Sequence, residues 1–261
     1  MKAFLHKIET YKEVLKMHNE IRDGLKWIVA ESSGLNRMPM ILDYIKSDIK
    51  FSGTCSFVTD CSILKKEFPF WSSQVYTIFP GESKQGVKVY CDMETDEGGW
   101  TVIQRRFDGM TSFSRTWHEY EYGFGNKERE YWLGNKYLHM MTSTGKYQLK
   151  VVLTDDNNKE THALYNIFSV GDKSSKYVLT IGEYSGTAGD WMKQNNKMKF
   201  TAKDQDNDNS GVNCANRTDQ KHGAWWHFSC SYSDLNVNYD KKLRWNSYAY
   251  LSSKMMLRRL S

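Results

Sequence analysis

The sequence predicts a chain that mixes helices with strands and changes its pattern twice along its length. Residues 3–30 follow a helical apolar spacing and contain no proline. From Cys55 onward, short runs that alternate apolar and polar residues are separated by Gly, Pro, Asn and Asp, which is typical of strands joined by turns. Residues 189–240 are polar and rich in loop formers. We therefore divide the chain into a helical N-terminal segment, residues 1–54, and a second domain, residues 55–261.

The N-terminal segment has the spacing of an amphipathic helix. Apolar positions recur every three or four residues but are interrupted at His18 and Gly24. Such a helix can pack on its own domain, or it can form a short coiled coil that joins protomers. The interruptions, and the lack of four clean heptads, favour the packed helix over the coiled coil. A second short helix is predicted for residues 40–50, after Pro39.

The second domain is predicted to contain several strands and two short helices. Pro80-Gly81 and Asp108-Gly109 each end a strand, because these pairs favour turns. The helices are predicted over residues 116–122 and 134–141. The strands are predicted over residues 74–79, 86–91, 98–106, 146–153, 163–170, 177–181 and 255–259.

Composition and charge exclude several classes of function. The 36 basic and 31 acidic residues leave a modest net charge of +5, and no basic block with interleaved aromatic residues predicts a nucleic-acid partner. No stretch approaches the apolar length of a membrane span. No serine or cysteine stands beside a base at the spacing of a known catalytic motif, so we do not expect an enzyme.

The cysteines indicate an oxidising compartment. Five are present without a CxxC pair, so two disulfides and one odd cysteine are expected of a secreted chain. A bridge between Cys214 and Cys230 would close a loop and contribute roughly 3 kcal/mol. The odd cysteine would be a free thiol or an intermolecular bridge. Asn216-Arg-Thr218 in the same loop is a glycosylation sequon. Because residues 1–9 lack the apolar run of a signal peptide, we expect an incomplete or processed start rather than a cytosolic chain.

The stretch from Asp204 to Cys230 carries the clearest functional signal. Asp204, Asp206 and Asp208 alternate, and on a tight loop their carboxylates can turn toward one point. A hard cation such as calcium prefers several oxygen ligands of this kind. An EF-hand loop would need Gly and Glu where the chain has Asn209 and Ala215. The local pattern alone therefore fits either a calcium site or a solvated acidic turn.

Several motifs in order along the second domain resemble one family. The motifs are Val89-Tyr-Cys91-Asp-Met93, residues 98–109, Gly123-Phe-Gly125, residues 131–135, residues 184–190, Asn213-Cys214-Ala215, and Gly223-Ala-Trp-Trp226 with Cys230. With these motifs, the chain from Cys61 to Arg258 resembles the C-terminal globular domain of fibrinogen, which also occurs in ficolins, tachylectin-like invertebrate lectins and angiopoietins. The resemblance implies an α+β fold with a central antiparallel sheet, short helices and a loop-rich, calcium-binding C-terminal subdomain.

The resemblance also implies the disulfides and the calcium ligands. It pairs Cys61 with Cys91 and Cys214 with Cys230, and it leaves Cys55 as a candidate for an interchain bridge. It places calcium between the carboxylates of Asp206 and Asp208 and the backbone carbonyls of Ser210 and Val212. Asp204 would then be an outer or solvated charge.

A ligand pocket is implied next to the calcium loop. Family lectins recognise acetyl groups, typically of N-acetylated sugars, and aromatic rings enclose the methyl group. A cis peptide between Ser229 and Cys230 would turn backbone N–H groups toward the acetyl oxygen. The chain departs from the lectin pattern at Lys221, where an aromatic residue is frequent, and at Ser231, where histidine is frequent. The predicted ligand-binding residues are Lys221, His222, Trp226, Ser229, Cys230, Ser231 and Tyr248.

Two adjacent tryptophans and two histidines flank this pocket. Because Trp225 and Trp226 are adjacent, one would pack inward and the other would face the pocket, but for each of them taken singly the core of the domain is the favoured position. His222 and His227 are interpreted chiefly as scaffold residues, since a lone histidine more often completes a hydrogen-bonded network than it holds a ligand.

The sequence thus predicts a secreted, calcium-binding lectin for acetylated glycans that acts in innate immune recognition. Assembly into a homo-oligomer through residues 1–54 or Cys55 would raise weak single-site affinity by avidity. A module that binds a receptor protein, as in angiopoietins or fibrinogen, is the first alternative, and the remodelled pocket favours it somewhat. A matrix or clotting component is the second alternative.

Overall fold

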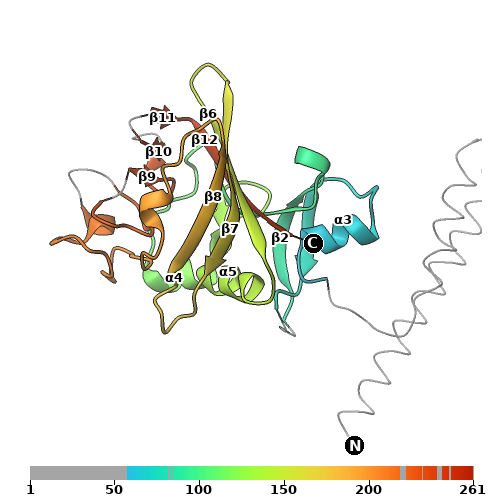
Figure 1. The fold of residues 1–261 in the computed structure, drawn as a ribbon, viewed down its shortest axis with the longest axis horizontal. Coiled ribbons are helices and arrows are strands. Elements are labelled where there is room, and N and C mark those ends of the chain that lie inside the picture. The colour runs from blue at the N-terminus through green and yellow to red at the C-terminus, as the bar shows by residue number, and fades with distance from the viewer. Residues whose placement is uncertain are drawn as a thin grey trace, which may run out of the picture. The chain divides into compact units, whose positions relative to one another are not determined.

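The computed structural model describes residues 58–81, 83, 85–217, 222–230, 232–239, 243–246 and 248–260 (Figure 1). The predicted N-terminal helices, the coiled coil and Cys55 lie outside the described residues. Lys221 and Ser231 of the predicted pocket also lie outside them.

Nine strands of the described chain form one sheet, in which the main path runs β1-β2-β3-β12-β6-β7-β8. Every pair along this path is antiparallel. The C-terminal strand β12 lies between β3 and β6, so the predicted closing strand is confirmed and occupies the middle of the sheet (Figure 1). The strands of the path are β1 (Gln74–Ile78), β2 (Val87–Asp92), β3 (Trp100–Arg106), β6 (Tyr147–Thr154), β7 (Glu160–Val170), β8 (Leu179–Gly186) and β12 (Ser252–Arg259).

The burial of side chains explains why these segments form strands. In β12, Ser253, Met255 and Leu257 are buried, while Lys254 and Arg258 on the other face are partly exposed. The short strands β4 (Phe124–Gly125) and β5 (Tyr131–Trp132) extend the sheet beside β3. The predicted strand at residues 163–170 begins three residues earlier, and the one at 177–181 begins two residues later and continues to Gly186.

Three α-helices occur in the described chain, and two of them were predicted. Thr116 caps α4 (Trp117–Tyr122) in a capping box with Glu119, which satisfies N–H groups at the helix start. The helix α5 (Asn135–Thr142) starts after Gly134. The third helix, α3 (Cys61–Glu67), was not predicted, because two turns are too short to display a helical apolar period.

A second, three-stranded antiparallel sheet lies in the region that was predicted to be rich in loops. Its order is β11-β10-β9, and the strands are β9 (Ser233–Asp234), β10 (Leu243–Trp245) and β11 (Tyr248–Tyr250). We refer to residues 187–250 as the C-terminal subdomain. Figure 1 shows this small sheet and the loops around it on one side of the main sheet.

An aromatic cluster joins the C-terminal subdomain to α4 and β5. The ring of Trp226 lies 5.1 Å from that of Phe200 and 6.1 Å from that of Trp132. Trp225 and Trp226 are both fully buried. The prediction that one of them faces the ligand is therefore wrong, since burial of large aromatic surface in the core outweighs exposure of either ring.

A buried ion pair lies at the same junction. Nε of Arg106 is 3.8 Å from Oε1 of Glu130, and their side chains are 1% and 0% exposed. The guanidinium donates hydrogen bonds to the carbonyls of Leu235 (3.2 Å) and Val237 (3.0 Å). Burial lowers the pKa of Arg106, and the charge of Glu130 opposes this effect. The carboxylate of Glu130 also accepts four backbone hydrogen bonds, from the N–H groups of Phe107, Asp108, Gly109 and Thr111.

We expect Glu130→Gln to lower the free energy of unfolding by about 3–5 kcal/mol, because it leaves the buried Arg106 cation without its counter-charge. The neutral amide would also lose acceptor capacity toward residues 107–111. The measurement is urea unfolding followed by tryptophan fluorescence. Glu128→Gln is the matched control, since Glu128 is exposed. Equal stability of the two variants would contradict this account of the junction.

Candidate functional site

Two disulfides occur in the described domain, and one of them lies at the candidate site. Cys61 is bonded to Cys91, with their Cα atoms 5.6 Å apart, and Cys214 is bonded to Cys230, with their Cα atoms 5.0 Å apart. Both pairings that the resemblance implies are confirmed. The second disulfide closes the loop that carries the glycosylation sequon, in which Asn216 is exposed.

The acidic loop is held by its own carboxylates. Oδ1 of Asp208 accepts a hydrogen bond from the N–H of Ser210 (2.8 Å), and Oδ2 accepts one from the N–H of Cys214 (2.9 Å). Asp206 accepts one from the N–H of Asp208 (3.2 Å). Asp208 therefore fixes the path from the acidic run to the disulfide, while Asp206 is exposed.

The oxygen atoms of this loop fit a calcium ion. Among the described residues, no hydrogen bond is donated to the carbonyl oxygens of Ser210 or Val212. Each carboxylate of Asp206 and Asp208 also keeps acceptor capacity beyond the bonds described above, because a carboxylate offers about four lone-pair positions. Carboxylate and carbonyl oxygens are the ligands that calcium prefers.

Asp204 has a second role beside the one predicted. Its Oδ1 accepts a hydrogen bond from the N–H of Trp117 (2.7 Å), at the first turn of α4. A carboxylate is favoured there because the first N–H groups of a helix have no partners within the helix. Asp204 therefore also caps a helix, which was not predicted, while its exposure agrees with the predicted solvated charge.

A hydrogen-bond network around Asp234 holds the start of the segment that leads from His222 to Cys230. Asp234 is fully buried, and its Oδ2 accepts hydrogen bonds from Nδ1 of His222 (3.2 Å) and the N–H of Gly223 (2.7 Å). A guanidinium N–H of Arg244 donates to Nε2 of His222 (3.1 Å), which places the imidazole proton on Nδ1. Burial raises the pKa of Asp234, but the hydrogen bond from His222 and the neighbouring histidines outweigh it, so the pKa is lowered.

The same network includes a possible set of metal ligands. Ligand atoms of His222, His227 and Asp234 lie within 4.8 Å of one another, and all three residues are buried. However, Nε2 of His227 donates to the carbonyl of Gly223 (2.9 Å), and the Arg244 cation lies against His222. Both ring nitrogens of His222 and Nε2 of His227 are therefore engaged, and the Arg244 cation would repel a metal ion, whereas Nδ1 of His227 has no hydrogen bond among the described residues. The cluster therefore fits the scaffold role that was predicted for both histidines.

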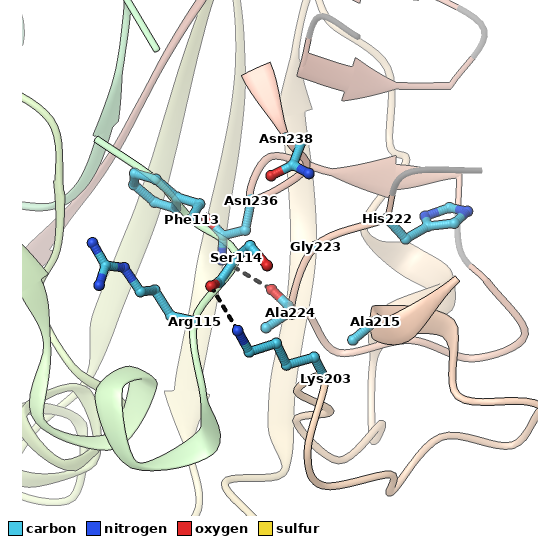
Figure 2. A pocket seen from close by; sticks show the side chains of 10 residues that line it. All are labelled: Phe113, Ser114, Arg115, Lys203, Ala215, His222, Gly223, Ala224, Asn236 and Asn238. Carbon is cyan, nitrogen blue, oxygen red and sulfur yellow. Dashed lines mark hydrogen bonds between the residues drawn. The ribbon is translucent and has the colours of Figure 1, made fainter. Parts of the chain in front are cut away.

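Two of the predicted ligand-binding side chains are buried instead. The side chain of His222 is 0% exposed, because it is enclosed between Asp234 and Arg244. Trp226 packs in the aromatic cluster described above. A cavity beside His222, lined also by Ser114, Lys203 and Asn236, has a volume of only about 30 Å³, which is room for water rather than a sugar (Figure 2).

The exposed side of the site is formed by other residues. Ser229 and Tyr248 are exposed, as predicted for ligand-binding residues, and so are Phe228 and Tyr232, at 47% and 51%. The sequence analysis missed Phe228 and Tyr232, although aromatic residues close to Cys230 on both sides were a usable signal. The N–H of Asn209 donates to the carbonyl of Phe228 (3.0 Å), which ties the acidic loop to this exposed segment.

The backbone at Cys230 differs from the expectation. No cis peptide bond occurs among the described residues, so the bond between Ser229 and Cys230 is trans. Cys230 instead has a φ of +50°, and this left-handed backbone reverses the chain at the disulfide. A trans bond avoids the cost of about 3 kcal/mol that a non-proline cis bond carries.

The antiparallel sheet, the two disulfides and the acidic loop beside an exposed aromatic surface together define a disulfide-bonded ligand-binding module. The model of the fibrinogen beta and gamma chains, C-terminal globular domain, matches residues 58–252. The chain belongs to this family, as the motifs predicted.

Relatives and solved structures agree with this assignment. Fibrinogen-like protein A of Apostichopus parvimensis is 51% identical over 153 residues, which cover 59% of this chain and 54% of that protein. Fibrinogen-like protein 1 of Mus musculus is 45% identical over 194 residues, which cover 69% of this chain and 60% of that protein. The chain thus spans little more than half the length of these relatives.

Among solved structures, the fibrinogen-like globe domain of human ANGPTL2 has a TM-score of 0.72 and 35% identity over 77% of this chain and 99% of that chain. The lamprey fibrin D-dimer, complexed with the peptide ligand Gly-His-Arg-Pro-amide, has a TM-score of 0.69 and 26% identity over 100% of this chain and 95% of that chain. Both likenesses confirm the fibrinogen-like fold. Among the helices of the described residues, none has the length and apolar composition of a membrane span.

We expect the domain to lose stability as the pH falls below about 7. Burial lowers the pKa of His227 below its ordinary value of 6.5, against the opposing charge of Asp234. The unfolded chain therefore binds this proton more readily, so the stabilisation is complete above the unfolded pKa and is lost as the pH falls toward the folded pKa. Each unit of difference contributes about 1.4 kcal/mol, which is about 3–6 °C in Tm for a domain of this size.

The measurement is Tm across this pH range for the native chain and for His227→Gln. The variant should show a flatter profile, whereas His162→Gln, at a half-buried histidine outside the network, should keep the native slope. A native slope in both variants would show that His227 is not the titrating group.

Proposed function

We propose that this chain is an extracellular recognition module that binds calcium in the acidic loop and an acetylated glycan on the adjoining exposed surface. The observation that carries the proposal is the hydrogen bond between Asn209 and Phe228, because it couples the acidic loop to the exposed segment around Cys230. The two disulfides support an extracellular location, since they persist in oxidising compartments.

Calcium would be held by the carboxylates of Asp206 and Asp208 and the carbonyls of Ser210 and Val212. When bound, it would neutralise two carboxylates on one short loop. Val212 is 52% exposed, so little apolar burial is available to order this segment without the ion. The loop that calcium orders would in turn fix Phe228 through Asn209.

The exposed surface has groups suited to an acetylated sugar. Among the described residues, no hydrogen bond occupies the backbone N–H groups of Ser229 and Cys230, so both are available to an acetyl oxygen. Phe228, Tyr232 and Tyr248 offer exposed rings that can pack against a methyl group or a sugar face. These rings would replace the aromatic wall that Lys221 interrupts in the sequence. Assembly through residues 1–54 or Cys55 would add avidity to such weak contacts.

A protein or peptide ligand is the second candidate. Two observations favour it: His222 and Trp226 are buried and do not line an open pocket, and the related lamprey fibrin D-dimer was solved with a bound peptide. Exposed aromatic rings beside a charged loop suit a protein partner as well as a glycan. Roles in innate immunity, in matrix or in clotting would depend on which partner binds.

We expect Asp206→Asn combined with Asp208→Asn to abolish the rise in Tm that calcium produces. The amides keep the size of the carboxylates but remove the negative charges that hold the cation. Calcium at about 100 times its Kd should stabilise the native chain by about 2.7 kcal/mol. Differential scanning calorimetry with calcium and with chelator measures the effect. Asp204→Asn is the matched control and should keep the calcium response, since Asp204 caps α4. An undiminished response in the double variant would refute the ligand assignment.

Capture on an N-acetylglucosamine surface tests the glycan. We expect the full chain to bind with calcium, to be released by chelator or free acetate, and to lose most of its binding in Tyr232→Ala. Phe70→Ala, at an exposed aromatic residue outside the C-terminal subdomain, is the control and should bind like the native chain. If calcium raises Tm but no acetylated surface captures the chain, the scaffold role of calcium stands and the partner is a protein.

A further inference from the structure

A second hollow occurs in the described chain on elements that the proposed calcium and glycan site does not use. It has a volume of about 310 Å³, at the lower end of the range for small-molecule sites. Its walls come from β2, from the segment between α4 and β5, and from α5. None of its lining residues belongs to the C-terminal subdomain.

The charge of this hollow is entirely positive among its described lining residues. Lys88 and Lys127 both line it, and no aspartate or glutamate does. Lys88 is exposed on β2. Neither lysine forms an ion pair with a carboxylate within the described part of the chain. The site thus presents two ammonium groups without an internal counter-charge.

Lys127 is the more unusual of the two lysines. Its Nζ lies 3.4 Å from the carbonyl of Trp132, a long hydrogen bond, and 4.4 Å from the centre of the Tyr131 ring. Burial lowers its pKa to about 8. A cation in such surroundings is incompletely solvated, and a carboxylate from a ligand would supply the missing charge.

The remaining wall of the hollow is aromatic and aliphatic. Tyr122, Phe124 and Tyr137 line it together with Val87 and Leu133, and Tyr122 is 43% exposed. Gly123 and Gly125 flank Phe124 with φ of +85° and +86°, and a Cβ at Gly123 would lie 2.2 Å from the carbonyl of Leu133. This backbone cannot accept larger residues, so beside Phe124 the wall is formed by the backbone itself.

We propose that this hollow binds a small carboxylate that carries a ring, with Lys127 and Lys88 meeting the carboxylate and Tyr122 and Tyr137 packing against the ring. Two sources share this chemistry, a uronic acid residue of a glycan and an aromatic carboxylate. A neutral ligand would leave the two ammonium groups unpaired, so the charge is part of the recognition. The site is independent of calcium, because none of its residues belongs to the acidic loop.

The test is isothermal titration calorimetry of the full chain with glucuronate and with benzoate, each beside its neutral analogue, glucose or benzyl alcohol. We expect at least one carboxylate to bind with a Kd of roughly 1 mM or tighter, and its neutral analogue to bind about tenfold more weakly or not at all. Binding of glucuronate alone would assign an acidic sugar, and binding of benzoate alone an aromatic acid. If neither carboxylate binds, or if the neutral analogue binds as tightly, the proposal fails.

The variant Lys127→Met removes the charge and keeps most of the aliphatic stem. We expect it to weaken carboxylate binding about tenfold, since a hydrogen bond to a charged group is lost. Lys159→Met, at an exposed lysine in the turn between β6 and β7, is the matched control and should bind like the native chain. Unchanged affinity in Lys127→Met would overturn the assignment.

Because Lys127 lies over the buried ring of Tyr131, a second variant at a surface lysine serves as an independent test. Lys88→Met alters only an exposed side chain of β2 and should also weaken binding severalfold. Amide NMR shifts caused by the carboxylate should map to residues 86–88, 122–127 and 137. Shifts confined to the C-terminal subdomain would place the binding elsewhere and overturn the proposal.

Discussion

The ion pair of Arg106 and Glu130 joins the two parts of this domain that must stay in register. Arg106 ends β3 in the main sheet and donates to the carbonyls of residues 235 and 237, which belong to the C-terminal subdomain. Glu130 pairs with Arg106, and its carboxylate accepts hydrogen bonds from backbone N–H groups within residues 107–111. Because both charges are almost wholly buried, each depends on the other and on these backbone partners. The position of the candidate site relative to the sheet therefore depends on this junction.

From that junction the network continues into the site. Asp234 directly precedes the carbonyl that Arg106 holds, and it binds His222 and the N–H of Gly223. The first residues of the segment that leads to Cys230 are thus held in place. The acidic loop is attached to its other end through Asn209 and Phe228. A buried carboxylate with all its partners in place is rigid, whereas the outer loop keeps carbonyl oxygens that no described group satisfies. This contrast is what suits the outer loop, rather than the buried histidine cluster, to an added cation.

The calcium loop and the hollow at Lys127 both collect charges of one sign, negative in the loop and positive in the hollow. The loop concentrates carboxylates and unpaired carbonyls, and the hollow concentrates ammonium groups against aromatic rings. In neither place does the described chain provide the compensating charge. Several charges elsewhere in the fold are paired internally, as at Lys254 with Asp92 and at Lys173 with Glu121. The two candidate binding sites differ from these pairs, because the described chain supplies no opposite charge to them.

The long strands, the helix α4 and the family could be predicted from the sequence, because alternation and ordered motifs are local signals, and the resemblance to the family supplied the pairing of four cysteines. The acidic loop could also be located, since its carboxylates are close in the chain. Which side chains of the site face outward depends on contacts between distant parts of the chain, so it could be read only from the folded structure. Trp226 and His222 are buried and Asp204 caps a helix because residues far away in the sequence enclose or need them. The short elements α3, β9 and β11 likewise had no detectable period, since they are stabilised by neighbours and not by their own residues.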